Sequence, residues 1–95
     1  MIIEPMTVSQ VLTAGMDSVN LINSINTDVS AVDAVDGKTQ SEINDVVDKN
    51  VRHLETILAY DGTDDIHPNV AGSDEDLSSY NDAISTGKTY IENNS

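Results

Sequence analysis

The chain of 95 residues carries 17 Asp and Glu against four Lys and Arg, which gives a formal charge of −13 at pH 7. This charge disfavours direct binding to nucleic acids or to anionic membranes, because both present negative phosphates. The sequence contains no Cys, so disulfides and thiolate metal sites are excluded. We expect one domain with a small aliphatic core, for which association with other chains is a common source of stability.

Residues 1–6 are expected to form a short extended arm, because Pro5 disfavours a helical conformation at Glu4. Ile2 and Ile3 make this arm apolar, and we expect it either to dock on a neighbouring chain or to pack back on its own domain. The N-terminus lacks the basic and apolar regions of a signal peptide, and no stretch approaches the length of a membrane span. The sequence therefore predicts a protein that is made and kept in solution.

A first long helix is predicted over residues 8–35. Thr7 and Gln10 match a capping box at its start, and Gly37 is placed to close its end. Its apolar residues alternate at spacings of three and four, as in a coiled-coil seam; they are Val8, Val11, Ile22, Ile25, Val29 and Val32. Several residues in the middle of this segment are poor helix formers, so packing must hold it; they are Asn20, Asn23, Ser24, Asn26 and Thr27.

The seam of this helix allows two interpretations. β-Branched residues at both seam positions favour assembly of three or four copies, whereas a broader apolar face, with Leu12, Val19 and Leu21, favours packing against other helices of the same chain. Under the first interpretation the contacts with other chains are made by the arm and the seam, namely by Ile2, Ile3, Ile22, Ile25, Val29 and Val32.

Two further helices are predicted, over residues 40–59 and 74–92, joined by an acidic linker over residues 61–73. The first of them starts at a capping box of Thr39 and Glu42, and the second follows the sequence from Ser73 to Asp76, which resembles a capping box. Gly87 lies on the apolar stripe of the last helix and marks a close helix crossing or a weakened last turn. We predict an all-α fold, either a three-helix bundle or a helical hairpin with a long first helix, with coiled-coil packing as an alternative.

Catalytic and metal-binding patterns are weak in this sequence. The two imidazoles are His53, on a helix flank, and His67, in the acidic linker, and we interpret both as boundary or surface residues. The segment beginning at Asp61 fails as a calcium loop, because Ile66 and Gly72 occupy the positions that need Gly and a bidentate acid. We predict a non-enzymatic protein without a cofactor or metal site, and leave open a weak cation site in the linker.

The runs Ile43–Glu55 and Asp82–Ile91 read INDVVDKNVRHLE and DAISTGKTYI, and they resemble small helical proteins of tailed bacteriophages. The resemblance implies a component of the virion, or an accessory to it, and carries over no functional residues. We therefore expect a many-copy structural protein at the capsid surface, neck or tail, with other virion proteins and further copies as partners. Two alternatives remain: an acidic DNA mimic that inhibits a host nucleic-acid-binding protein, supported by the charge, and a small intracellular helical adaptor.

Overall fold

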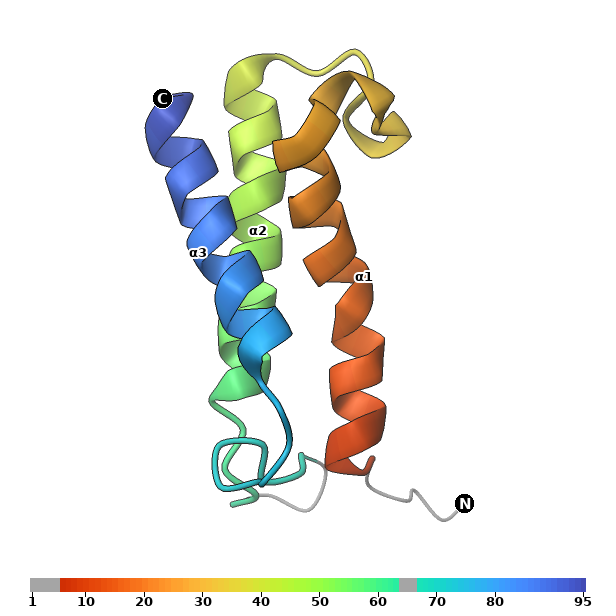
Figure 1. Ribbon diagram of the computed structural model, residues 1–95, viewed down its shortest axis with the longest axis vertical. Helices are drawn as coiled ribbons and strands as arrows, with labels where there is room; N and C mark the ends of the chain where they lie inside the picture. The colour runs from red at the N-terminus through yellow and green to blue at the C-terminus, as the bar shows by residue number, and fades with distance from the viewer. Residues whose placement is uncertain (1–5, 64–66) are drawn as a thin grey trace.

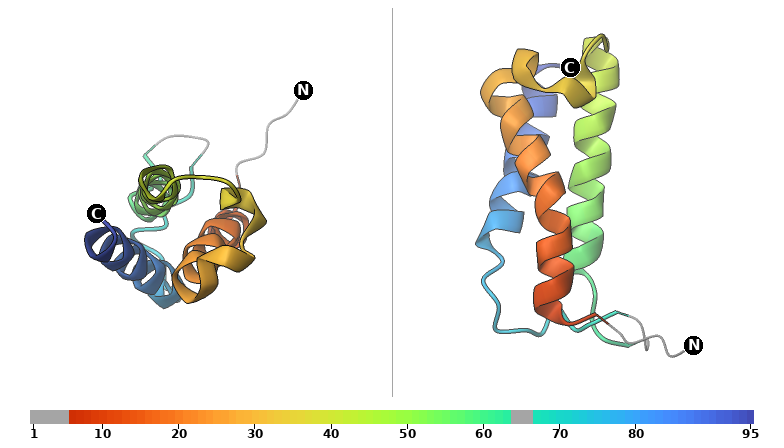
Figure 2. Two further views of the ribbon diagram at one scale, coloured as in Figure 1. Left: turned by 90° about the horizontal axis from the view of Figure 1, so that it is seen from above. Right: turned by 90° about the vertical axis from the view of Figure 1, so that its right-hand side faces the viewer.

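The computed structural model describes residues 6–63 and 67–95, and this part of the chain forms three α-helices and two short 3-10 turns. The helices are α1 (Val8–Asp28), α2 (Gln40–Leu58) and α3 (Ser78–Asn93). The turns η1 (Val29–Ala31) and η2 (Asp33–Val35) lead from α1 to α2. Each helix packs against the other two, as Figures 1 and 2 show, so the three-helix bundle is confirmed and the open hairpin is not formed. Ile2 and Ile3 lie outside the described residues.

Both predicted capping boxes are present. The Thr7 hydroxyl accepts a hydrogen bond from the Gln10 amide at 3.1 Å, and the Gln10 side chain accepts one from the Thr7 amide at 2.8 Å. Thr39 and Glu42 make the same reciprocal pair at 3.2 and 2.9 Å. These bonds satisfy amides that have no partner within the helix, and they set where α1 and α2 begin.

The first helix is shorter than the sequence indicated. Its α-helical part ends at Asp28, whose backbone is extended at φ −159° and ψ 90°, and the chain then continues through η1 and η2 to Val35. Local side-chain hydrogen bonds accompany this break: the Thr27 hydroxyl donates to the Asn23 carbonyl at 2.8 Å, and the Ser30 hydroxyl donates to the Asp28 carboxylate at 2.6 Å. Such bonds compete with regular helix, and the turns bring Val35 into the core.

The last helix begins at Ser78 and not at residue 74. Ser73 does not cap it, because the Ser73 hydroxyl donates to the Val70 carbonyl at 2.8 Å and so belongs to the preceding loop. That loop is anchored by Val70, which is fully buried, and by a hydrogen bond from the Ala71 amide to the Tyr60 carbonyl at 2.9 Å. The Asp76 carboxylate instead accepts from the Ser78 amide at 2.9 Å and serves the start of α3.

The seam of α1 lies in the core of the same chain. Ile22 and Ile25 are each only 1% exposed, so in the single chain they pack within the bundle. Their contact with other chains stays a prediction. Val29 and Val32 are partly buried against this core. The close helix crossing expected at Gly87 is also found, because a Cβ atom there would lie 2.5 Å from Val51 Cγ2 and 3.3 Å from Ile22 Cγ2.

Candidate functional site

Two partly buried polar contacts join α1 to the other helices. The Ser18 hydroxyl donates to the Asn50 side-chain oxygen of α2 at 2.8 Å, and the Asn50 amide group donates to the Val46 carbonyl at 2.8 Å. From α3, the Tyr80 hydroxyl donates to the Leu12 carbonyl at 2.6 Å. A Tyr hydroxyl is protonated at neutral pH and can donate, and burial raises the pKa of Tyr80 further above its ordinary value. The apolar stripe of α1 and these contacts face α2 and α3. The opposite side of α1 therefore faces solvent.

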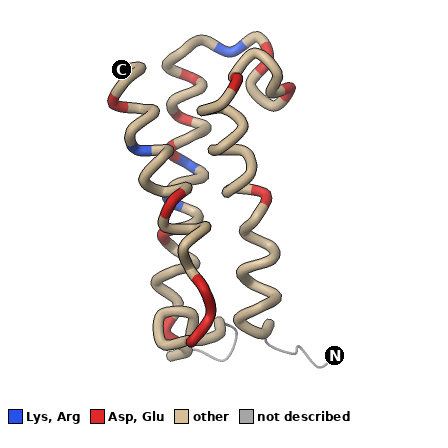
Figure 3. The backbone as a smooth tube through the Cα atoms, viewed as in Figure 1, with Lys and Arg blue, Asp and Glu red and all other residues tan. Residues whose placement is uncertain are grey.

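On that opposite side, one stretch of ten residues lies between the exposed acids Asp17 and Asp28 and carries no charge. No acidic or basic residue occurs between Asp17 and Asp28, and Figure 3 shows the corresponding uncharged stretch along α1. We call its exposed side chains the α1 outer face; they are Asn20, Asn23, Ser24, Asn26 and Thr27. This face presents amide and hydroxyl groups, which donate and accept hydrogen bonds but carry no net charge.

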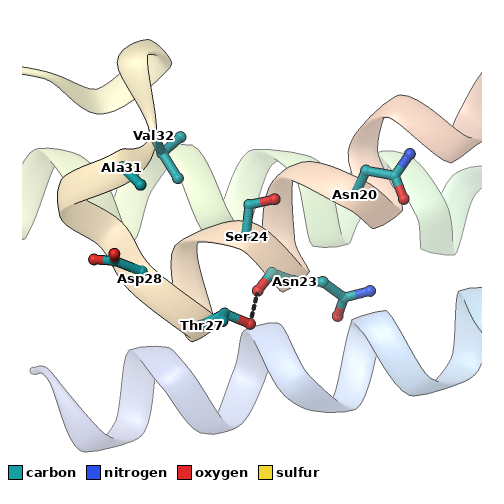
Figure 4. A pocket seen from close by; sticks show the side chains of 7 residues that line it. All are labelled: Asn20, Asn23, Ser24, Thr27, Asp28, Ala31 and Val32. Carbon is teal, nitrogen blue, oxygen red and sulfur yellow. Dashed lines mark hydrogen bonds between the residues drawn. The ribbon is translucent and has the colours of Figure 1, made fainter.

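A shallow groove of about 460 Å³ lies on this side of the molecule, where η1 and the residue after it fold back beside the end of α1. In Figure 4 the side chains of α1 and those of the turn region border the same hollow. Its lining combines amide and hydroxyl groups and the Asp28 carboxylate on the helix side with apolar side chains on the turn side; it consists of Asn20, Asn23, Ser24, Thr27, Asp28, Ala31 and Val32. The groove is suited to contact with another surface through mixed polar and apolar side chains.

The other helices expose charge instead. On α2, Arg52 Nε lies 2.9 Å from Asp48 Oδ2, and Lys88 of α3 places its Nζ atom 3.1 Å from Glu55 Oε2. These ion pairs are exposed at the surface, where such pairs add little stability. Exposed charge is therefore present on α2 and α3, whereas α1 has none between Asp17 and Asp28.

The residues considered for chemistry are not brought together. His53 is exposed on α2, whereas His67 is half-buried in the linker with its ring centroid 4.2 Å from that of Tyr60. In residues 6–63 and 67–95 no group of three or more His, Cys, Asp or Glu side chains is placed to hold a metal ion. Residues 64–66 of the linker, and with them the predicted calcium-loop mismatch at Ile66, lie outside the described residues.

The contact residues predicted from the sequence lie in the arm and the seam, and none of them belongs to the α1 outer face. The signal that could have found it is the run of ten residues from 18 to 27 without charge, combined with side chains of low helix propensity at the solvent-facing positions. None of the helices in the described part of the chain is long and apolar enough to cross a membrane. Comparison with known proteins finds no matching family model, no matching curated protein and no matching solved structure.

Proposed function

We propose that this protein is a non-enzymatic structural component of a tailed-phage virion, made in the host cytoplasm, that acts through contacts with other virion proteins and with further copies of itself. The observation that carries the contact role is the α1 outer face, an uncharged surface held in place by a bundle that is otherwise acidic. The resemblance of α2 and α3 to small phage proteins supports the virion as the setting.

Mass spectrometry of purified particles from a phage that encodes this chain tests the proposal. We expect the protein in the particles at a constant ratio to the major capsid or tail proteins, retained after washing in high salt. A chain that is abundant in infected cells but absent from purified particles would contradict a structural role.

The acidic DNA mimic is the second function, and the charge of −13 is the observation that favours it. A mimic needs carboxylates arrayed like phosphates over one face. Here Asp48 and Glu55 form ion pairs with Arg52 and Lys88. The carboxylates of Glu42 and Asp76 accept hydrogen bonds at the starts of helices. The five residues of the α1 outer face include no acid. Capture of host nucleic-acid-binding proteins by the purified chain at low salt, with release by competing DNA, would favour the mimic over the structural role.

A further inference from the structure

We propose that Asp36 is a site of spontaneous backbone modification, at which this aspartate converts to isoaspartate through a cyclic succinimide formed with Gly37. The chain contains two Asp-Gly pairs: the first, Asp36 and Gly37, lies between η2 and α2, and the second, Asp61 and Gly62, lies just after α2. The two pairs differ in their surroundings, and only those of the first pair leave both reacting groups free. The inference goes beyond the proposed function and does not depend on it.

The reaction needs only groups of the chain itself and water. The Gly37 backbone nitrogen attacks Cγ of the Asp36 carboxyl group. A C–N bond forms while the nitrogen loses its proton and the carboxyl group loses its hydroxyl, and the two leave together as water. Water then adds to one of the two carbonyl carbons of the five-membered ring and reopens it. Opening at the main-chain carbonyl leaves the backbone running through the side chain of residue 36, with no net change in composition.

The surroundings of the first pair leave the nucleophile and the carboxyl group unoccupied. Asp36 and Gly37 are both exposed, and a Cβ atom at Gly37 would meet no atom within 4 Å. The next amide along the chain, that of Lys38, donates to the Val35 carbonyl at 3.1 Å. In the described part of the chain, by contrast, no hydrogen bond or ion pair involves the Gly37 amide or the Asp36 carboxylate.

The backbone of the first pair is also free to reach the geometry of ring closure. The five-membered ring requires the Gly37 nitrogen and Cγ to lie on the same side of the Asp36 Cα–C bond, so the backbone must rotate from its ψ of 132°. Gly37 permits this rotation, because it has no Cβ atom to shield the nitrogen and occupies φ 75° without strain. Exposed connections between helices are also the segments in which such local motion costs least.

The second pair is held by its neighbours. The Asp61 carboxylate accepts a hydrogen bond from the Thr63 amide at 3.1 Å, and Asp61 forms an isolated β-bridge with Asn69. A Cβ atom at Gly62 would lie 3.0 Å from the Asn69 Cβ atom, so Asn69 packs closely against this pair. Ring closure at Asp61 would break these contacts. We therefore expect Asp61 to react more slowly, although it too is followed by Gly.

The product would change the connection that leads into α2. Isoaspartate lengthens the backbone by one carbon atom at residue 36. The turn at this position is closed by the hydrogen bond from the Lys38 amide to the Val35 carbonyl, and Thr39 caps α2 directly after it. We expect the modified turn to lose this hydrogen bond, so the melting temperature should fall as isoaspartate accumulates.

Incubation of the purified chain at neutral pH and physiological temperature tests the inference, with isoaspartate located by peptide mapping and electron-transfer mass spectrometry. Trypsin separates the two pairs, because Lys38, Lys49 and Arg52 lie between them. We expect several-fold more isoaspartate at residue 36 than at residue 61. When the chain is incubated in urea, the folded surroundings are lost, and we expect similar amounts at the two positions.

Two matched variants control for the sequence of each pair. Asp36→Glu keeps the charge but requires a six-membered ring, which closes far more slowly, so this variant should lose the modification at residue 36. Asp61→Glu makes the same change at the second pair and should leave isoaspartate at residue 36 unaltered. Far-UV circular dichroism confirms that both variants remain folded. Equal amounts of isoaspartate at the two positions of the folded chain, or isoaspartate at residue 36 only in urea, overturn the inference.

Discussion

The Tyr80 hydroxyl reaches the backbone of α1 because residue 15 has no side chain. A Cβ atom at Gly15 would overlap the Tyr80 hydroxyl oxygen and lie 2.8 Å from Tyr80 Cζ. A glycine inside a helix usually costs stability, and replacing it with Ala usually returns about 0.5–1 kcal/mol. At residue 15 the Tyr80 side chain occupies the space that a Cβ atom would need, so Gly is favoured over Ala there.

We therefore expect Gly15→Ala to destabilise the protein by about 1–3 kcal/mol, the usual cost of overpacking a core. Urea unfolding followed by circular dichroism measures this change. The reverse substitution at the exposed neighbour, Ala14→Gly, is the control and should cost only about 1 kcal/mol through helix propensity. A Gly15→Ala variant more stable than the unchanged protein would show that Tyr80 does not pack against this position.

The pKa of Tyr80 gives a second prediction at this scale. Burial raises that pKa above its ordinary value of 10.0, so the folded state favours the protonated form. The stability that follows is complete below the pKa of the unfolded chain and is lost as pH rises through the higher pKa of the folded state. We expect the free energy of unfolding to decline above pH 10, and to decline less steeply in Tyr80→Phe. Identical pH profiles for the two proteins would contradict a buried phenol.

At the scale of the elements, the start of α3 depends on one exposed carboxylate. The Asp76 side chain accepts from the Ser78 amide, and this hydrogen bond lowers the pKa of Asp76. We expect Asp76→Ala to lower the melting temperature more than Asp74→Ala does, because the first change removes the acceptor of the Ser78 amide. Thermal unfolding of the two variants measures the difference. If Asp74→Ala lowers the melting temperature more than Asp76→Ala does, the helix begins near residue 74, as the sequence indicated.

The stripe of α1 is tested by two neighbouring substitutions. Ile25→Asp places an unpaired charge at a buried position and should cost about 4 kcal/mol or more, enough to unfold a domain of this size. Asn26→Asp adds the same charge one residue away on the exposed surface and should leave the helix content unchanged. Circular dichroism distinguishes them. Two folded variants with equal melting temperatures would mean that Ile25 does not lie in the core.

The elements differ in how far their sequence determines them. The starts of α1 and α2 could be predicted because Thr7 and Thr39 meet their partners only three residues away. The start of α3 could not, because it depends on Val70 folding under the loop and drawing the Ser73 hydroxyl to its carbonyl. Apolar spacing shows which side of α1 is buried, but it does not show whether the covering residues belong to the same chain. The sequence alone therefore leaves both interpretations of the seam open.

At the scale of the whole molecule, one chain encloses its own apolar residues and leaves the neutral side of α1 in solvent. The three helices form a bundle about 42 Å long, with η1 and η2 at one end and the linker between α2 and α3 at the other (Figure 1). Association with other chains is therefore expected to add to a fold that already exists.

A dilution series recorded by two-dimensional amide NMR tests this account most directly. We expect the dispersed spectrum of a folded three-helix bundle at every concentration. A spectrum that collapses on dilution to that of an unfolded chain would contradict the account, because it would show that the apolar stripe of α1 is covered only when a second chain is present.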